Sequence, residues 1–377
     1  MARSGDGKDA AGSQEPRSAL ASAFSEEAPQ PGPANGLMDI PGLSVGHAEA
    51  EPPARSGVTV IRCAGLWPAS VDVRGGGPAT RETDLLAPSA TVAAAHALVL
   101  SGGSVFGLAA ADAVVRRLSA EGVGLQPSPG DPPVPIAPAA CLYDLPLSAP
   151  GAAPPPDYGA LAEGALANAA SRASESAVGS IGAGRGARAG LHPGGLGEAS
   201  LVWPSGLRVA ALVAINPVGS PYRDGDPSTG VFWAWDLERR WRGAPEFGGA
   251  RPDPARAAPS APFPPDAKFQ VSADLGAGPA GPQLNTMLAA VATSAPLDAP
   301  ALHRVAIMAQ DGFARAVRPA HTSFDGDTVF ALAPPAAAGS QAGVSSSPAL
   351  VSLIGAAAAD CVARAICRGV HAARGGG

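Results

Sequence analysis

Apolar residues along the chain fall into short runs and helix-spaced patterns that together predict a mixed fold. Runs rich in β-branched or small apolar residues predict strands at 58–63, 139–144, 207–215, 287–294 and 328–333. Apolar residues at helical spacing predict helices at 108–118, 158–173, 299–317 and 350–373. Residues 91–100 are apolar and fit a strand or a helix. Because strands and helices do not alternate strictly, the pattern favours an α+β sandwich over a doubly wound parallel sheet.

Segments rich in polar residues, glycine or proline separate these elements and set the expected domain limits. Residues 1–36 lack an apolar period and predict a disordered N-terminal extension, followed by a single domain over residues 37–377. Residues 180–197 are dense in glycine and predict a segment too flexible for regular structure until substrate or neighbours pin it. Residues 243–283 predict a surface loop that is longer than a compact domain normally carries, and such loops are often functional.

A glycine-rich turn at 101–107 leads directly into the helix predicted at 108–118. The free N–H groups of such a turn can hold a phosphate or a carboxylate, or its glycines can let the helix pack closely on a sheet. The turn lacks the Lys-Ser/Thr ending of a P-loop, and the dinucleotide-binding fingerprint is absent. We interpret it as close packing beside a substrate pocket, with Gly102, Gly103 and Ser104 as candidate substrate-binding residues.

Composition and charge narrow the function classes. Hydrophobic residues make up 46% of the chain and aromatic residues only 5%, so a large core has to be built from Ala, Val and Leu. The net charge is −6 and no dense basic run is present, which gives nucleic-acid binding no support. The sequence has no apolar stretch of membrane-spanning length free of helix breakers and charges, and no signal-peptide pattern. We therefore expect a cytoplasmic protein without a membrane partner.

The metal-binding residue types show no ligand spacing. Four scattered cysteines form no CxxC pair and are expected to be buried free thiols in a reducing compartment; they are Cys63, Cys141, Cys361 and Cys367. His47 and His96 have no partners at metal-ligand spacing. The sequence therefore predicts neither a metal site nor a cofactor.

The strongest chemical signal is the pair Asn285-Thr286 before the strand predicted at 287–294. The Thr286 hydroxyl lies β to the nitrogen of the Asn285–Thr286 amide, which is the position that an N–O acyl shift needs. If this bond breaks, Thr286 gains a free α-amine that can serve as the base for its own hydroxyl. The alternative is a threonine that merely opens a strand.

Two further groups of polar residues are candidates for the same chemistry. Asp325 and Asp327 flank one glycine, and positions i and i+2 of an extended segment face the same side. Two carboxylates this close should raise one pKa and form an acid–base relay, bind a substrate ammonium group or orient the Thr286 amine. A solvated Asp-Gly turn is the alternative. Asn216 ends a predicted strand, where its amide can donate to an oxyanion or form an Asx-turn before Pro217.

Eight short segments follow one another in a fixed order: PGLSVGH at 41–47, RGGGPATRET at 74–83, LSGGSVFGL at 100–108, PAACLYD at 138–144, GAG at 182–184, NPVG at 216–219, LNT at 284–286 and HTSFDGDT at 321–328. From residue 37 to the C-terminus, this order resembles the DmpA/BapA family of self-processing aminopeptidases, which includes the nylon-oligomer hydrolase. The resemblance implies a four-layer α/β/β/α sandwich of the N-terminal-nucleophile-hydrolase type.

The resemblance also implies a processing event and a substrate class. The precursor would be cut between Asn285 and Thr286 into an α chain (37–285) and a β chain (286–377), which stay together and assemble into a homo-oligomer. The aminopeptidase branch often has Ser as its nucleophile, whereas Thr after Asn matches the nylon-hydrolase branch. Substrates would be peptides or amides with a free amine end.

Site residues follow from the same resemblance. It places catalytic groups at Asn216, Asp325 and Asp327, and a tyrosine near the pocket at Tyr143, whose hydroxyl would be a further oxyanion donor or simply a half-buried aromatic. One position departs from the pattern. A lysine that is catalytic in the nylon hydrolase follows the Gly-Ala-Gly segment, and the aligned residue here is Leu191, which carries neither charge nor a transferable proton.

The leading hypothesis is therefore a self-cleaving amidohydrolase that acts through an acyl-enzyme on Thr286. One alternative is an acyltransferase like ornithine acetyltransferase, which has a similar fold and a threonine nucleophile but passes its acyl group to an amine. The other, suggested by Leu191, is a catalytically degenerate homologue retained as a binding or scaffold protein.

Overall fold

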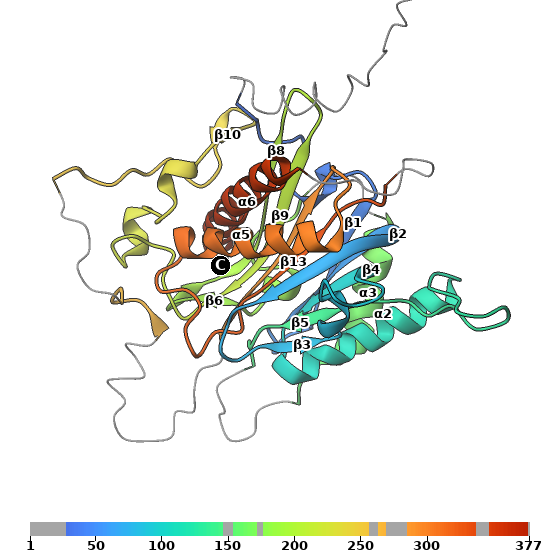
Figure 1. Ribbon diagram of the computed structural model, residues 1–377. Coiled ribbons are helices and arrows are strands. Elements are labelled where there is room, and N and C mark those ends of the chain that lie inside the picture. Colours follow the sequence, from blue (N-terminus) through green and yellow to red (C-terminus); the bar gives the residue numbers. More distant parts are fainter. Residues whose placement is uncertain are drawn as a thin grey trace, which may run out of the picture.

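Two sheets share one long strand at the centre of the molecule. The computed structural model (Figure 1) describes residues 28–145, 154–171, 176–255, 263–268, 285–336 and 347–375. Strand β2 (Gly57–Val73) shifts register at a bulge between Arg62 and Trp67. Its first half pairs with β1 (Leu43–Glu49) on one side and β4 (Ala94–Ser101) on the other. Its second half pairs with β13 (Thr328–Leu332).

The second half of β2 begins the sheet that carries the site. Next to β13 lies β12 (Thr286–Thr293) in parallel orientation, then β9 (Arg208–Asn216) and β8 (Gly195–Val202), both in antiparallel order. The other sheet continues from β4 to β5 (Ala139–Cys141) and β3 (Ala79–Arg81). Two small hairpins lie outside both sheets, formed by β6 (Arg188–Ala189) with β7 (His192–Pro193) and β10 (Arg240–Trp241) with β11 (Ala244–Pro245).

Helices cover the outer face of each sheet, which gives four layers. Helices α5 (Ala299–Ala316) and α6 (Pro348–Arg374) pack on the β8–β9–β12–β13 sheet, and α2 (Ala109–Ala120) and α3 (Tyr158–Ser171) pack on the other. Short 3₁₀ turns occupy Leu37–Asp39, Asp84–Leu86, Ser104–Leu108, Gly182–Gly184, Pro227–Thr229 and Trp235–Leu237.

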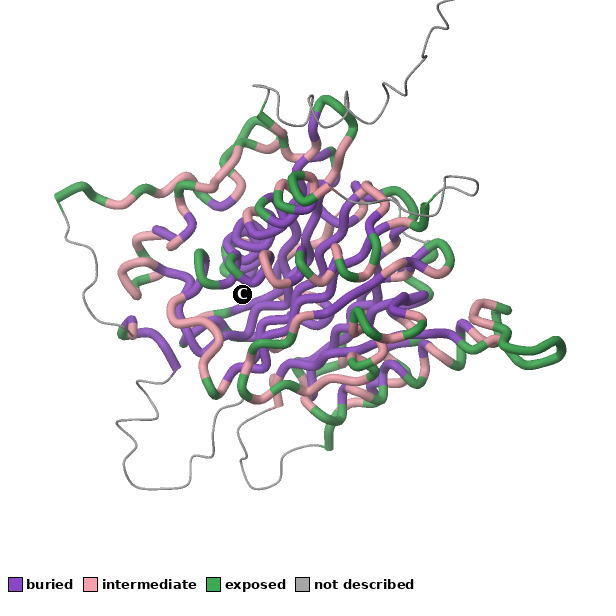
Figure 2. The backbone as a smooth tube through the Cα atoms, viewed as in Figure 1, coloured by how far each residue is buried: buried purple, intermediate pink, exposed green. Residues whose placement is uncertain are grey.

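The strand sequences explain this layering, because successive residues of a strand face opposite sides. In β9, Val213 joins the core under α5 and α6, whereas Leu212 joins the core between the two sheets. In β12, Val291 and Leu288 divide in the same way. A strand that is buried on both faces has to be apolar throughout, and Figure 2 shows these strands as continuously buried. The predicted four-layer α/β/β/α sandwich is confirmed.

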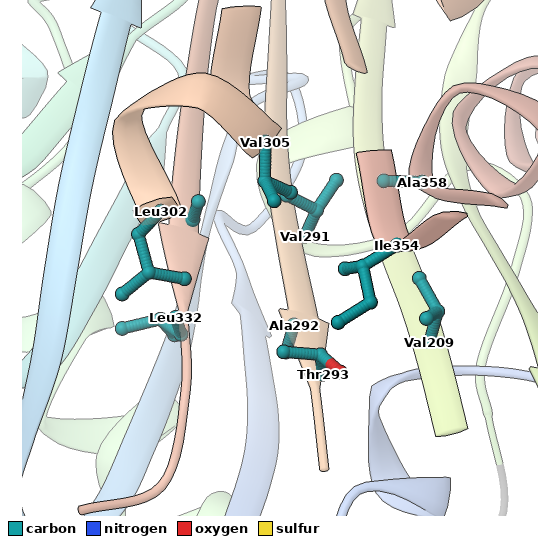
Figure 3. A pocket seen from close by; sticks show the side chains of 10 residues that line it. Val209, Val291, Ala292, Thr293, Leu302, Val305, Leu332, Ile354 and Ala358 are labelled. Atoms are coloured by element: carbon teal, nitrogen blue, oxygen red, sulfur yellow. The ribbon is translucent and has the colours of Figure 1, made fainter. Parts of the chain in front are cut away.

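Helix α6 is the one described helix that is long and apolar enough to cross a membrane, yet 72% of its most apolar window is buried inside the molecule. Figure 3 shows how closely it packs. Ile354 and Ala358 of α6 face Val209 and Val291 on the sheet, and the gap between them has no room for a water molecule. Its apolar character is therefore explained by its place in the core.

Most predicted elements are present within a few residues of their expected bounds. Residues 91–100, which fit either a strand or a helix, contain most of strand β4. Residues 180–197 were predicted to lack regular structure until substrate or neighbours pin them, and neighbouring segments do so here. This segment forms the Gly182–Gly184 turn, the β6–β7 hairpin and the start of β8. Its glycines allow close backbone contacts: a Cβ on Gly184 would lie 2.2 Å from the carbonyl carbon of Gly195. Such contacts hold a segment that local propensity alone leaves undetermined.

The predicted disordered extension is also wrong at its C-terminal end, because residues 28–36 are folded. The backbone of Gln30 pairs with that of Val202, and Asn35 is fully buried. The Asn35 side-chain oxygen accepts hydrogen bonds from Ser200 N at 2.9 Å and from Arg364 Nη2 at 3.2 Å. Polar contacts with distant elements order this segment, and no local apolar pattern reports them. Residues 1–27 of the predicted extension lie outside the described part of the chain.

Candidate active site

Strand register places the nucleophile candidate between two other predicted site residues. Thr286 is the first residue of β12, and its Cα pairs with that of Asn216, the last residue of β9. On its other side the parallel register runs from the Asn285–Asp325 bridge to the Leu288–Thr328 pair, which sets Thr286 beside Gly326. Asn216 lies 70 positions before Thr286 in the chain, and Gly326 lies 40 positions after it. Strand pairing therefore brings distant parts of the chain together around one hydroxyl.

Gly326 contacts both halves of the bond that is predicted to break. Its N–H donates to the carbonyl oxygen of Asn285 at 2.7 Å, and the Thr286 hydroxyl donates to the same oxygen. A Cβ at Gly326 would lie 2.7 Å from Thr286 Oγ1 and 2.8 Å from the carbonyl oxygen of Gly77. The glycine between the two aspartates thus leaves space for the hydroxyl and supplies a donor to the carbonyl.

We expect Gly326→Ala to slow self-cleavage and turnover by about 100-fold, because the added methyl group has to displace the Thr286 hydroxyl from its position. Cleavage is measured on a denaturing gel and turnover with an aminoacyl anilide. Gly164→Ala is the matched control, since its Cβ would meet only Ala48 Cβ at 3.5 Å. Wild-type rates in Gly326→Ala would mean that the hydroxyl does not need this space.

Asp325 is fully buried and its carboxylate is occupied by donors. It accepts hydrogen bonds from Val218 N at 3.0 Å, Thr322 N at 2.9 Å and Thr322 Oγ1 at 2.6 Å. Burial and then the negative charge of Asp327 raise the pKa of Asp325 to about 6. The expectation that one member of the pair has a raised pKa is therefore met, and a solvated turn is excluded.

Asp327 is equally buried and fixes the residue after the nucleophile. It accepts from Met287 N at 2.8 Å, from His321 N at 3.0 Å and from His321 Nδ1 at 2.8 Å. Burial opposes the charged form of His321, but the hydrogen bond and charge of Asp327 outweigh it and raise the pKa of His321. Asp327 thus positions the start of β12 while His321 balances its charge.

Asn216 has a fixed side-chain orientation. Its Oδ1 accepts from Arg188 N at 2.9 Å and from Lys268 Nζ at 3.1 Å, and its Nδ2 donates to the carbonyl oxygen of Tyr143 at 2.9 Å. An amide nitrogen has two hydrogens, so the second one remains for a developing oxyanion. Tyr143 contributes its backbone carbonyl to the site and is among the residues that line the neighbouring cavity.

Lys268 is a site residue that the sequence analysis missed. Its Nζ donates to Asn285 Oδ1 at 2.6 Å and to Asn216 Oδ1 at 3.1 Å, so it touches the residue before the predicted cut. Burial lowers the pKa of Lys268 to about 7, Asp325 opposes this shift, and Arg188 adds to it. The chain contains only two lysines, Lys8 and Lys268, among 26 basic Lys and Arg residues. This rarity is the one signal in the sequence that singles it out.

The described part of the predicted 243–283 surface loop shows why Lys268 reaches the site. Lys268 N donates to the carbonyl oxygen of Val218 at 2.9 Å, and Asp266 accepts from Ser220 Oγ at 2.6 Å. The N–H of Leu191 donates to the carbonyl oxygen of Asp266 at 2.9 Å. Residues 266–268 are buried, so the surface prediction is wrong for them. The family pattern places a lysine at the position of Leu191. In this chain, a lysine from the 243–283 segment lies beside that position instead.

A cavity of about 610 Å³ opens beside Asn285 and Lys268. Its described lining comes from Pro53–Arg55, from Tyr143–Leu145, from the glycine-rich segment that begins at Ser180, and from the single residues Asn216, Lys268 and Asn285. Thr286 itself is 3% exposed and is not part of the lining, whereas the preceding residue, Asn285, is.

The glycine-rich turn lies next to this cavity without lining it. Gly103 N donates to Asp144 Oδ1 at 2.8 Å, and Ser104 N donates to the carbonyl oxygen of Leu142. Gly103 therefore holds the lining residue Asp144, and direct substrate contact by Gly102, Gly103 or Ser104 stays a prediction. Among the described residues, no three His, Cys, Asp or Glu side chains are grouped so that they could hold a metal ion.

The chain is similar to known peptidase sequences. The model of peptidase family S58 matches residues 35–375. An uncharacterised aminopeptidase of Mycobacterium tuberculosis H37Rv is 41% identical over 348 residues, which cover 89% of this chain and 93% of the relative. An uncharacterised aminopeptidase of Mycobacterium leprae is 42% identical over 355 residues, 90% of this chain and 91% of the relative.

Solved structures share the fold at lower identity. The β-aminopeptidase of a Burkholderia species superposes with a TM-score of 0.61 at 23% identity, over 91% of this chain and 88% of that one. The L-aminopeptidase D-Ala-esterase/amidase of Ochrobactrum anthropi, a variant of the Ntn hydrolase fold, has a TM-score of 0.58 at 22% identity, over 93% and 88%. With the family match over nearly the whole domain, the chain belongs to peptidase family S58 and is a peptide-bond hydrolase.

Proposed function

We propose that the chain is an aminopeptidase that cuts its own Asn285–Thr286 bond and then uses the freed Thr286 as its nucleophile. One observation carries the proposal. The Thr286 hydroxyl contacts the carbonyl oxygen of Asn285, while the N–H of Gly326 donates to that oxygen at 2.7 Å. The attacking group and a donor for the charge that develops on the carbonyl are thus already in place.

Self-cleavage begins when Thr286 Oγ1 attacks the carbonyl carbon of Asn285. The carbonyl oxygen becomes an oxyanion that the N–H of Gly326 stabilises. The carbon–nitrogen bond then breaks, and the nitrogen takes up the proton that Oγ1 lost. The acyl group is now on Oγ1, and Thr286 has a free amine. Water then hydrolyses the ester, which releases a carboxylate at Asn285 and restores the hydroxyl.

This first step needs a base other than the α-amine of Thr286, which exists only after the cut. Lys268 has the properties required. A neutral amine has two hydrogens and one lone pair, and Lys268 Nζ has two acceptors, Asn285 Oδ1 and Asn216 Oδ1. With a pKa of about 7, Lys268 is substantially neutral at physiological pH and can accept the proton of the Thr286 hydroxyl.

Turnover repeats the chemistry on a substrate that enters from the cavity. Loss of the Asn285 peptide bond opens Thr286 to the cavity, and its new amine, with an ordinary pKa of about 8, serves as the base. The second hydrogen of Asn216 Nδ2 donates to the substrate oxyanion, and Asp325 and Asp327 keep the start of β12 in position. The acyl group passes to Thr286 Oγ1 and then to water.

An acyl-enzyme trap tests this proposal. The purified enzyme is mixed with an aminoacyl p-nitrophenyl ester, quenched in acid after milliseconds and digested for mass spectrometry. We expect one aminoacyl adduct on the peptide that starts Thr286-Met287-Leu288. An adduct on another side chain would contradict the proposal. So would turnover without any adduct when the ester used is known to deacylate slowly.

Location and assembly belong to the proposal as well. The four cysteines are free and buried, which supports a reducing, cytoplasmic compartment. Assembly into a homo-oligomer of cleaved protomers rests on the family resemblance alone.

A further inference from the structure

One carboxylate oxygen at the cavity has no described partner. Asp144 is the only acidic residue among those that line the cavity in the described structure. Its Oδ1 accepts from Gly103 N at 2.8 Å and from Ser56 Oγ at 3.0 Å. Its Oδ2 is buried and has no hydrogen-bond partner among the described residues. A buried carboxylate oxygen without a partner is costly, so a donor from a ligand would satisfy it.

We propose that Asp144 binds the free ammonium group of the substrate and so gives the enzyme its preference for chains with an unblocked amine end. This inference rests on the proposed aminopeptidase function and adds the residue that recognises the substrate's charged end. An ammonium group offers three hydrogens and a positive charge, which match the unpartnered oxygen of a carboxylate whose residue lines the cavity.

The other carboxylates near Thr286 are already used. Asp325 accepts three hydrogen bonds, from Val218 and Thr322, and Asp327 accepts three, from Met287 and His321. Neither lines the cavity. A substrate ammonium at either one would have to displace a donor that holds the site together, whereas Asp144 has an oxygen to spare.

Asp144 is also linked to the reaction centre by a short chain of contacts. Its neighbour Tyr143 accepts a hydrogen bond from Asn216 Nδ2 at 2.9 Å through its backbone carbonyl, and Asn216 pairs with Thr286 across the sheet. Asp144 is therefore the direct neighbour of the residue whose carbonyl orients Asn216, which in turn pairs with Thr286.

The surrounding residues hold the carboxylate in one orientation. Ser56 Oγ bonds both Asp144 Oδ1 and, at 2.9 Å, the Tyr158 hydroxyl. A Cβ on Gly102 would lie 2.2 Å from Asp144 Oδ2, so any larger residue there would push the carboxylate away. This gives the glycine-rich turn an indirect part in substrate binding, through the carboxylate that it supports.

Burial raises the pKa of Asp144 to about 6, which the hydrogen bonds from Gly103 and Ser56 only partly offset. The titratable groups that face it are Cys141 and Tyr158, and burial raises the pKa of both above their usual range. They stay neutral near pH 6, so neither changes its charge as Asp144 titrates. The cations that line the same cavity, Arg55, Arg188 and Lys268, leave Asp144 as its one described site for a positive group.

The test compares alanyl-p-nitroanilide with propionyl-p-nitroanilide, which lacks only the amine. In Asp144→Asn we expect the ratio of the two kcat/KM values to fall about 100-fold, as for loss of one partner of a buried charge pair, with little change for the propionyl substrate. Glu51→Gln is the matched control, because it removes a carboxylate from an exposed position near the cavity rim at Pro53. An unchanged ratio in a cleaved and active Asp144→Asn enzyme would overturn the inference.

A second measurement applies if Asp144→Asn does not fold or cleave. In the wild type, the same ratio should fall as the pH drops through about 6, because protonation of Asp144 removes its charge. The ratio is followed from pH 6.5 to pH 5, where the substrate amine is protonated and Lys268, with a pKa of about 7, is already mostly charged. A ratio that is constant over that range would overturn the inference. Failure of the proposed function is distinguishable, since it would leave the wild-type chain uncut or without an adduct on Thr286.

Discussion

Thr286→Ala is expected to remain a single chain of 36.9 kDa and to have no measurable peptidase activity. Without the hydroxyl, neither the acyl shift at Asn285 nor the acyl-enzyme can form, and loss of a nucleophile typically costs at least about 10⁴-fold in kcat. Thr286→Ser keeps a β-hydroxyl and should still be cut. A denaturing gel and aminoacyl-anilide turnover measure both effects.

Thr293→Ala serves as the control for the strand itself. Thr293 is the last residue of β12, is as buried as Thr286, and accepts a hydrogen bond from Ala295 N at 3.2 Å. It should be cut and active. A Thr286→Ala protein that is still cleaved after residue 285, or that still hydrolyses the anilide, would rule out Thr286 as the nucleophile.

Lys268→Met is expected to slow self-cleavage by about 100-fold to 1,000-fold. Methionine matches the length of lysine but has no proton acceptor of comparable basicity and no donor for Asn285 or Asn216, and loss of one general base costs about that much. Lys268→Arg should not restore the rate, because a guanidinium stays protonated. Cell-free synthesis followed by a time course on a denaturing gel measures the rate, with Lys8→Met as the control.

The direction of the Lys268 pKa shift adds a pH dependence. Because burial lowers its pKa to about 7, the fraction of neutral amine grows as the pH rises through 7, and wild-type cleavage should accelerate there. An unfolded lysine titrates near 10.4, so between these values the unfolded state binds more protons. The free energy of unfolding should therefore rise with pH over that window in the wild type and less in Lys268→Met. Equal cleavage rates and pH profiles in both proteins would show that Lys268 is not the base.

The layers of the fold were predictable from sequence because they depend on local patterns. Strands such as β9 and β12 are apolar on both faces, since each lies between a helix layer and the second sheet. The Thr286 site was predictable in part. The prediction came from the order of short motifs along the chain, and the apolar pattern of the strands did not contribute to it. What no local pattern contains is strand register, which decides that Thr286 lies between Asn216 and Gly326.

Lys268 and Asn35 illustrate the limit in physical terms. Both lie in segments rich in Pro, Gly and polar residues, and both are ordered by hydrogen bonds to residues far away in the chain, such as Asn216 and Arg364. Composition predicts that such segments are exposed to solvent, because burial of their polar atoms is favourable only when hydrogen-bond partners are present. Those partners become visible only in three dimensions.

Intact-mass spectrometry of the freshly purified protein tests the central claim most directly. If Thr286 is released by self-cleavage, two masses are found that sum to the full chain plus one water, and the smaller fragment begins Thr-Met-Leu. A single species at the 36.9 kDa of the full chain, or a cut at any other bond, would contradict the account.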